Sequence, residues 1–388
     1  MRSAALALSF MSLAGGAAGE AMPPWAVKLP PGPAVQRTGF DQLQGWDVQD
    51  FSQSYRVFRT ACAGAGAAAS RPGAPPPPKL AGVCAAADAA GGLTGTEARR
   101  FFETRFEAFE IKPDGGPGFM TGYYEPEVFG TLERSVEFSA PLYARPAGLI
   151  AVPGGAGVDA ETRVVRKSPD GGQEPYPERA AIENGALGDE AKPLAFVRDE
   201  VEAFFIHVQG SARIRFADGS VRRLTYAARN GRPYTSIGRI IASEGLMKIE
   251  DMNLASIKAF LRADPERGRA ILRRNQSFIF FTEAAHLGRD QGPTGGAGLP
   301  LTPYLSIAID NTLWTYGLPV WIEAELPEPG GGAKPFRALT ITQDTGTAIR
   351  GAARVDLFHG SGEAAGERAG LLRHPVRFVA LMPRESLP

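Results

Sequence analysis

The stretch that decides the fold is QDTGTAIRGAARVDLF, residues 343–358, in which two strand-like runs flank a glycine-containing loop. Aspartate is a poor strand former, because its short polar side chain competes with the hydrogen-bond ladder and resists burial. Nevertheless Asp344 ends the apolar run ALTITQD and Asp356 lies within RVDLF. Between them, Gly346 and Gly351 allow tight turns and the close approach of a ligand. This segment is therefore the first candidate for a functional site.

Strand alternation places Asp356 in a particular setting. Val355 and Leu357 point to one face, and Arg354, Asp356 and Phe358 point to the other. An aromatic neighbour makes a partly dry environment, which raises the pKa of a carboxyl group. A carboxylic acid that stays protonated near neutral pH can protonate a leaving glycosidic oxygen. The residues alone leave a plainer alternative open, in which Asp356 caps a turn or forms a surface ion pair with Arg354.

Outward from this segment, the chain reads as a mostly β protein. Short apolar runs separated by glycine-rich turns continue from residue 278 to the C-terminus: FIFF, SIAID, VWIEAEL, ALTITQD, VDLF and VRFVALM. Upstream, FMTGYYEPEVFG predicts a strand that bends at Pro126, and residues 201–228 predict a hairpin turning at Ala217-Asp218-Gly219. Barrel closure would hide the edges of so many short strands. We expect one discontinuous barrel domain, residues 22–124 plus 275–388, and an inserted β domain, residues 125–274.

A few helices are expected as well. Residues 92–110 show helical spacing with Thr94 and Glu97 as a capping pair, which would place Phe101, Phe102, Phe106 and Phe109 on one side. Residues 253–274 return to helical spacing, broken near Pro265. Residues 40–59 form a third helical candidate. The low-complexity stretch 63–79 is expected to be a surface excursion.

The N-terminus and the charge balance limit the partners. Residues 1–21 are typical of a secretory signal peptide, with Arg2, an apolar core and a small-residue end; the alternative is a disordered N-terminus. We expect an exported protein of the periplasm, with no cysteine near the cleavage point for lipid attachment. Because 42 basic and 42 acidic residues cancel and the basic ones are scattered, we expect no nucleic-acid partner.

Cysteine and histidine usage argues against a metal site. Cys62 and Cys84 flank the low-complexity stretch; we expect them to be disulfide-bonded, with two free thiols as the alternative. Four scattered histidines have no metal-ligand spacing. We therefore expect neither a metal nor another cofactor.

Other polar and aromatic residues fit a carbohydrate groove. Tyr123 and Tyr124 offer flat faces to sugar rings. Gln209, Ser211 and Ser236 could hydrogen-bond hydroxyl or N-acetyl groups, although each taken singly is more often a turn or cap residue. With Thr121, Gly346 and Gly351 they complete the set of expected substrate-binding residues.

Seven segments in order now resemble the membrane-bound lytic murein transglycosylase A family. They are TGYYEPE (121–127), FFIHVQGSARI (204–214), YTSIGR (234–239), NQSFIFF (275–281), GLPLTPYLSIAID (298–310), GLPVWI (317–322) and residues 343–370. The resemblance implies a double-psi β-barrel with an inserted second β domain and a groove between them. It makes Asp356 the catalytic residue and Asp344 a second aspartate near the site. Asp310 matches another position of the family, which we expect to be structural. Many relatives are lipoproteins, so outer-membrane attachment of this chain is in doubt.

The resemblance also implies the reaction. A lytic transglycosylase cleaves the β-1,4 bond between N-acetylmuramic acid and N-acetylglucosamine in peptidoglycan and leaves a 1,6-anhydromuramoyl end. Because the attacking hydroxyl belongs to the substrate, one acid suffices where ordinary glycosidases need two. Two alternatives stay open: a non-catalytic peptidoglycan-binding barrel, and an inverting hydrolase that uses Asp344 and Asp356. The expected partner is the glycan strand, with contacts to outer-membrane or cell-wall proteins left open, and we expect a monomer.

Overall fold

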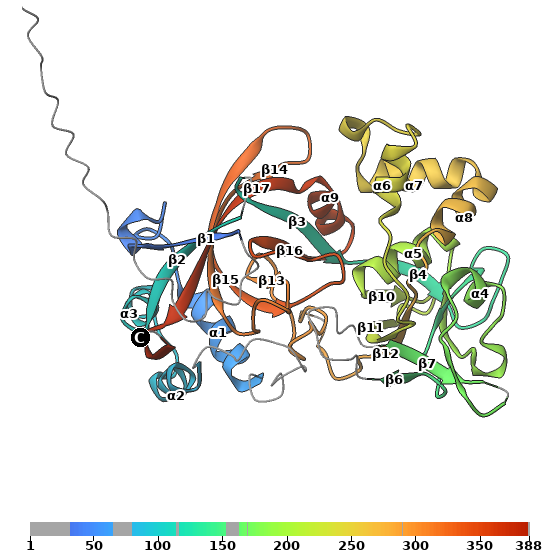
Figure 1. The fold of residues 1–388 in the computed structure, drawn as a ribbon, viewed down its shortest axis with the longest axis horizontal. Coiled ribbons are helices and arrows are strands. Elements are labelled where there is room, and N and C mark those ends of the chain that lie inside the picture. Colours follow the sequence, from blue (N-terminus) through green and yellow to red (C-terminus); the bar gives the residue numbers. More distant parts are fainter. Residues whose placement is uncertain are drawn as a thin grey trace, which may run out of the picture.

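Strands from the early and the late parts of the chain interleave in one closed ring. The computed structural model describes residues 32–64, 80–113, 116–152, 163–168, 170–288 and 290–386. The predicted signal segment and nearly all of the low-complexity stretch lie outside these residues. Figure 1 shows two lobes, with the first and last parts of the chain on the left and the middle part on the right. The structure is mostly β, as the sequence predicts.

The seventeen strands within the described residues are β1 (Ala34–Thr38), β2 (Phe106–Lys112), β3 (Gly118–Glu125), β4 (Glu127–Thr131), β5 (Ala140–Tyr143), β6 (Ile150–Val152), β7 (Arg163–Lys167), β8 (Gln173–Pro175), β9 (Pro193–Val197), β10 (Ser211–Arg215), β11 (Val221–Arg229), β12 (Ile279–Glu283), β13 (Ser306–Ala308), β14 (Pro319–Pro327), β15 (Ala333–Asp344), β16 (Arg354–Ser361) and β17 (Arg373–Pro383). The α-helices are α1 (Ser52–Gly64), α2 (Leu80–Ala90), α3 (Gly95–Arg105), α4 (Arg179–Glu183), α5 (Glu200–Gln209), α6 (Ile237–Ser243), α7 (Leu254–Ala263), α8 (Pro265–Arg273) and α9 (Glu363–Leu371). None of the helices in this part of the chain is long and apolar enough to cross a membrane.

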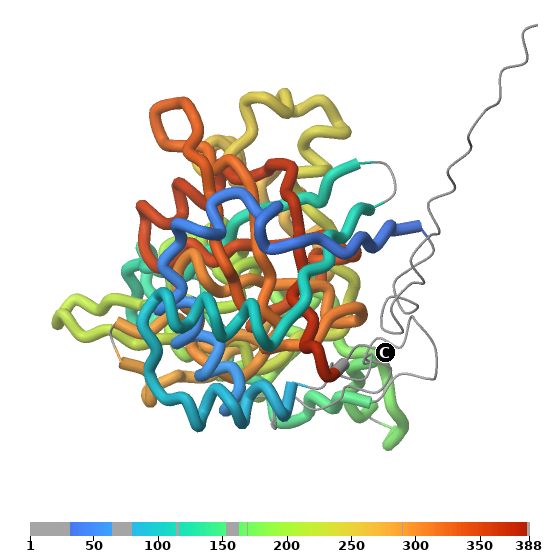
Figure 2. Tube along the Cα trace, turned by 90° about the vertical axis from the view of Figure 1, so that its left-hand side faces the viewer, coloured from blue at the N-terminus to red at the C-terminus, as the bar shows by residue number. Residues whose placement is uncertain are grey.

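Six strands of the larger sheet close on themselves. The order is β1-β2-β17-β14-β15-β13-β16-β3, and β17 also pairs with β3, so the ring runs from β17 through β14, β15, β13 and β16 to β3. Inside it lie fully buried side chains, among them Val355, Leu357, Met120 and Ile322. In Figure 2, blue-to-teal and orange-to-red segments wind through the same body. The closed barrel confirms the predicted discontinuous architecture of the ring, while the double-psi connectivity stays a prediction.

Three helices cover the outside of this barrel. Phe58 of α1 and Phe102 of α3 pack with Trp321 of β14 in one buried cluster, together with Phe51, which directly precedes α1. The predicted disulfide between Cys62 and Cys84 is present and joins α1 to α2. These helices come before β2 in the chain and pack against strands near its C-terminus. They therefore fix the N-terminal part of the chain against its C-terminal part.

The middle of the chain builds the second lobe. Its six-stranded sheet has the order β12-β11-β10-β4-β9-β5, and an isolated bridge between Ala144 and Phe281 links the segment after β5 to β12. This bridge makes the sheet barrel-like, as predicted. A three-stranded sheet, β6-β7-β8, and the helices α5 to α8 complete the lobe.

Two local predictions were wrong. The first half of the predicted hairpin, residues 201–209, is the helix α5, which Asp199 caps and Gly210 ends in the left-handed conformation. Because α5 is buried on nearly all sides, its sequence lacks the polar stripe that marks a surface helix. The second error concerns residues 106–110: α3 ends at Arg105, and Phe106 and Phe109 belong to β2. The Thr94–Glu97 capping box and the break before Pro265 are confirmed.

One buried carboxylate lies where the chain passes from the barrel to the second lobe. Glu125 is fully buried, and its oxygens lie 2.8 Å from Arg213 Nε and 2.9 Å from Arg223 Nε. Ser361 of β16 donates a hydrogen bond to the same carboxylate at 2.7 Å. Glu125 therefore links β16 of the barrel to β10 and β11 of the other lobe.

Candidate active site

The register of three strands brings the two candidate aspartates together. Ala308 of β13 pairs with Asp344 of β15 on one side and with Asp356 of β16 on the other. Neighbouring strands lie about 4.8 Å apart, so the two aspartate backbones are separated by roughly 10 Å across β13. On its other side, Asp356 pairs with Thr121 of β3. The separate sequence segments 121–127 and 343–358 thus form one site.

Asp356 lies in a dry setting with two polar partners. The Thr121 hydroxyl donates a hydrogen bond of 2.5 Å to Asp356 Oδ1, and Arg354 Nη2 donates to the same Thr121 oxygen at 2.8 Å. Burial raises the pKa of Asp356 to about 6, and the Asp344 carboxylate adds to this rise. The Arg354 charge and the Thr121 hydrogen bond act in the opposite direction. The residue as a whole is nevertheless partly exposed.

Asp344 is held by three donors. Gly296 N and Thr345 N donate to Oδ1 and Tyr123 Oη donates to Oδ2, each at 2.8 Å. Burial raises the pKa of Asp344, while these hydrogen bonds lower it. A carboxylate with both oxygens engaged is poorly placed to activate a water molecule, whereas its charge can still act on nearby groups.

Asp310 supports the loop between the two aspartates. Its Oδ1 accepts from Thr312 and, at 3.2 Å, from Arg350 Nη1. Its Oδ2 accepts from Gly351 N at 2.9 Å. Gly351 has φ +123°, a conformation that a residue with a side chain rarely adopts. These contacts agree with the structural role expected for Asp310 and explain the glycine.

The structure brings only some of the expected binding residues into the site. Thr121 and Tyr123 contact Asp356 and Asp344 directly. Burial and the nearby aspartates raise the pKa of Tyr123 well above its ordinary value, so its hydroxyl keeps its proton. Its ring lies 5.3 Å from the ring of Phe358, which therefore contributes to the dry surroundings of the site.

Three expected residues have other roles in the structure. Tyr124 is buried and packs against Gly366 of α9, so it offers no open face to a sugar ring. Gln209 Oε1 accepts from Tyr124 N at 3.1 Å and therefore fixes the end of β3. Ser211 is buried at the start of β10. Alternation along β3 explains the difference for the two tyrosines, since neighbouring residues of a strand face opposite sides.

Ser236 and Gly346 have local roles in the backbone. Ser236 is the N-cap of α6, where its Oγ accepts from Arg239 N at 3.3 Å. Gly346 is partly exposed in the loop after β15, and its carbonyl accepts from Ile349 N at 3.0 Å. Ser236 is thus a cap residue, the plainer alternative stated for it above, and Gly346 lies in a turn.

Two groups of the site were not predicted from the sequence. Gly296, in the glycine-rich stretch 292–298, donates to Asp344, and a Cβ there would lie 2.4 Å from the Tyr316 hydroxyl oxygen. Tyr234, in the motif YTSIGR, has a pKa raised first by burial and then by the charge of Asp356. The motif YTSIGR was identified in the sequence. However, the aspartates that give Gly296 and Tyr234 their place in the site are more than 45 positions away from them in the chain.

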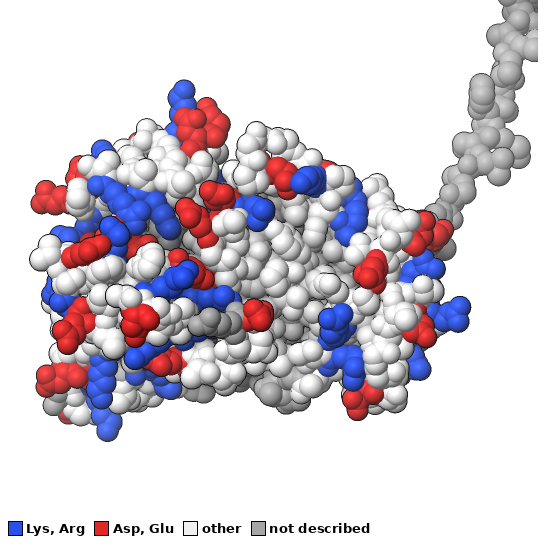
Figure 3. Space-filling model, turned by 180° about the vertical axis from the view of Figure 1, so that it is seen from behind, with Lys and Arg blue, Asp and Glu red and all other residues white. Residues whose placement is uncertain are grey.

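Among the described residues, no group of three or more histidine, cysteine or acidic side chains is arranged to hold a metal ion. In Figure 3, acidic and basic side chains alternate over the second lobe, and the central strip of this face is mostly uncharged. The groups that contact Asp356 and Asp344 are hydroxyl and backbone groups.

Comparison with known proteins gives the same division of the chain into an inserted part and a C-terminal part. The family described as MltA specific insert domain matches residues 119–282, and the 3D domain family matches residues 305–382. The chain is 32% identical over 295 residues to a membrane-bound lytic murein transglycosylase A of Escherichia coli, covering 74% of this chain and 72% of that protein. It is 36% identical over 204 residues to the Vibrio cholerae protein of the same name, covering 51% of this chain and 54% of that protein.

Solved structures agree. A membrane-bound lytic murein transglycosylase from Agrobacterium tumefaciens superposes with a TM-score of 0.81 at 32% identity, covering 91% of this chain and 98% of that one. MltA from Neisseria gonorrhoeae gives 0.75 at 32% identity, covering 91% and 94%. The fold and site thus define a two-lobed β protein that joins a 3D domain to an MltA insert. More particularly, the chain belongs to the membrane-bound lytic murein transglycosylase A family.

Proposed function

We propose that this protein is a peptidoglycan lytic transglycosylase and that Asp356 carries its chemistry. The observation that supports this most is the carboxyl group of the partly exposed residue Asp356, which accepts a hydrogen bond from the Thr121 hydroxyl and whose pKa burial raises to about 6. Membership of the family supplies the reaction, and a structure of E. coli MltA with bound chitohexaose shows that a relative binds a β-1,4-linked glycan.

In the proposed mechanism, Asp356 first donates its proton to the glycosidic oxygen as the bond from the muramoyl anomeric carbon breaks. The resulting carboxylate then removes the proton from the C6 hydroxyl of the same sugar, whose oxygen bonds to that carbon. One bond breaks and one forms, and Asp356 recovers its proton. No water enters, and internal attack gains from proximity. Asp344, held by Gly296, Thr345 and Tyr123, would stabilise the positive charge that develops on the sugar.

Three further expectations belong to this proposal. The substrate groove lies between a barrel domain of residues 22–124 plus 275–388 and an insert of residues 125–274. The protein is exported after loss of residues 1–21 and acts in the periplasm, with its membrane association open. It acts as a monomer on glycan strands.

The test is the Asp356→Asn variant incubated with purified sacculi. We expect release of 1,6-anhydromuropeptides to fall by at least the factor of about 10²–10⁴ that is typical of general acid–base catalysis. The remaining release should lie close to the detection limit of the assay. Mass spectrometry separates the alternatives, because anhydro and hydrolysed ends differ by one water. Hydrolysed ends from the wild-type protein would select the inverting hydrolase, and binding without release would select the non-catalytic barrel. Full activity in the variant would remove Asp356 from its role.

A further inference from the structure

Phe119 is an exposed aromatic residue on one of the strands that form the site. It lies in β3, two positions before Thr121, so the two side chains project from the same face of the strand. The register pairs Phe119 with Arg354 of β16, and the next pair on that face joins Thr121 and Asp356. Phe119 is 44% exposed, whereas the residue between, Met120, is fully buried inside the barrel. The Phe119 ring therefore lies on the outer face of the barrel, one strand pair away from the proposed acid.

A chain of direct contacts connects Phe119 to Asp356. The guanidinium carbon of Arg354 lies 5.3 Å from the centre of the Phe119 ring. Arg354 Nη2 donates to Thr121 Oγ1 at 2.8 Å, and the same hydroxyl donates to Asp356 Oδ1 at 2.5 Å. Arg354 Nη1 donates to the carbonyl of Val355. Because both terminal nitrogens are engaged, the guanidinium is fixed against one face of the ring and holds it by a cation–π contact.

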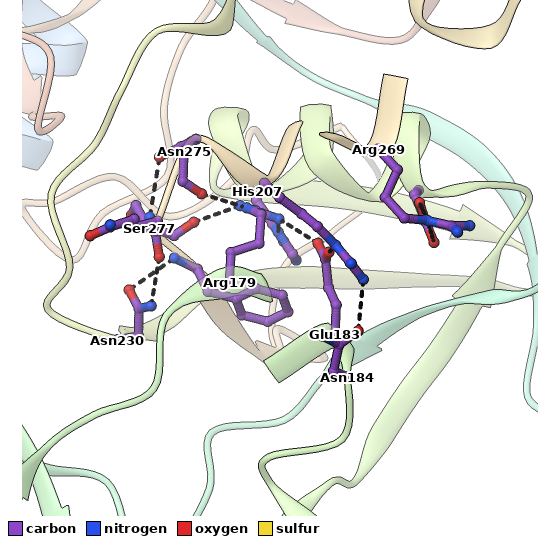
Figure 4. A network of polar contacts seen from close by, with 12 residues as sticks. Arg179, Glu183, Asn184, His207, Asn230, Arg269, Asn275 and Ser277 are labelled. Carbon is purple, nitrogen blue, oxygen red and sulfur yellow. Dashed lines mark hydrogen bonds and ion pairs between the residues drawn. The ribbon is translucent and has the colours of Figure 1, made fainter. Parts of the chain in front are cut away.

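The second lobe contains an arginine–aromatic contact of a different kind. Arg179 lies over the rings of Phe204 and Phe278 and donates to two backbone carbonyls (Figure 4). These three side chains are almost fully buried, so the contact serves the packing of the lobe. At the site, by contrast, the Phe119 ring keeps much of its surface open to solvent. Packing alone therefore does not account for the ring that Arg354 holds.

The position and the chemistry of the Phe119 ring suit one sugar unit. Residues two positions apart in a strand are separated by about 6 to 7 Å, which is similar to the length of one pyranose unit in an extended glycan. A β-1,4-linked pyranose carries its hydroxyl groups at the rim and C–H groups on its two faces. Such a face loses contact with water when it lies on an aromatic ring, and its C–H groups meet the negative face of the π system.

We propose that Phe119 forms a sugar-binding subsite next to Asp356, in which its open ring face stacks on the sugar unit that adjoins the cleaved bond. Arg354 holds the ring from the other side. This inference rests on the proposed function and adds a residue that grips the glycan strand. Because the ring is already fixed before the glycan binds, little freedom is lost on binding. A contact of this kind contributes a factor of about 3 to 10 in affinity.

The experiment uses the inactive Asp356→Asn protein, so that binding of chitohexaose is measured without cleavage. We expect Phe119→Ala in this background to weaken binding by about 3- to 10-fold. Phe119→Leu, which keeps an apolar side chain without a flat face, should also weaken binding, and Phe119→Tyr, which keeps the ring, should bind as the parent protein does. Phe216→Ala is the matched control, because Arg222 lies over the Phe216 ring at 5.4 Å in the turn between β10 and β11.

Two results would overturn the inference. The first is binding that is unchanged in Phe119→Ala and Phe119→Leu. The second is binding that is weakened equally in Phe119→Tyr or in Phe216→Ala, because the loss would then not depend on the ring at this position.

A pH series separates stacking from a purely positioning role. The Arg354 charge lowers the pKa of Asp356. If Phe119 only sheltered Arg354 from water, Phe119→Ala in the otherwise wild-type protein would move the falling limb of kcat/KM against pH and leave chitohexaose binding unchanged, contrary to the inference. We expect instead a lower kcat/KM for anhydromuropeptide release with the limb in place. A wild-type protein that yields no anhydro ends would reject the proposed function, whereas the binding measurements test the subsite separately.

Discussion

At the scale of single residues, the pKa of Asp356 is set by a balance of opposing neighbours. Burial and Asp344 raise it, and Arg354 and the Thr121 hydroxyl lower it, which leaves it at about 6. Only the protonated form can donate to the leaving oxygen. Activity should therefore be highest below pH 6 and should fall as pH rises through the pKa.

This balance predicts the effect of Arg354→Gln. Removing the positive charge should raise the pKa of Asp356, so the falling limb of kcat/KM against pH should move to higher pH by about one unit. A pH series of anhydromuropeptide release measures the limb. Arg198→Gln, which removes a surface charge paired with Glu137, should leave it in place. A limb unmoved by Arg354→Gln would show that another group controls the acid step.

At the scale of elements, the Cys62–Cys84 disulfide joins α1 and α2 across 22 positions. Closing a loop of this size contributes about 3 kcal/mol by restricting the unfolded chain. The double variant Cys62→Ser/Cys84→Ser should lose about this much in the free energy of unfolding, measured by denaturant titration. Reducing agent should destabilise the wild-type protein and leave the double variant unaffected. Equal stability of the two proteins under oxidising conditions would contradict the expectation.

The elements also show what the sequence could and could not predict. Strands such as β14 to β17 were predictable, because apolar runs between glycine-rich turns fix their positions. The helix α5 was not, since burial on all sides removes the polar stripe that distinguishes a helix. Asp344 and Asp356 were identifiable as polar residues in strands. Tyr234 and Gly296 were not, because only the folded arrangement brings them near the aspartates.

At the scale of the whole molecule, Glu125 links the two lobes. Glu125→Gln should destabilise the protein by about 3 to 5 kcal/mol, because it leaves the buried Arg223 and the partly buried Arg213 without their counter-charge. Glu127→Gln is the matched control: its pair with Arg215 is more exposed and should contribute less than about 1 kcal/mol. Denaturant titration of both variants measures the two losses in the free energy of unfolding. Similar losses would show that the buried cluster around Glu125 contributes no more than an exposed ion pair.

The closed ring of strands has a consequence for when the protein becomes active. Thr121 and Asp356 pair across 235 positions, and β3 completes the ring only with β16 and β17. A chain still being synthesised, or truncated before residue 354, lacks Asp356, the proposed acid, and has no closed wall to hold it. The enzyme is therefore inactive until its last strands have been synthesised and have closed the ring.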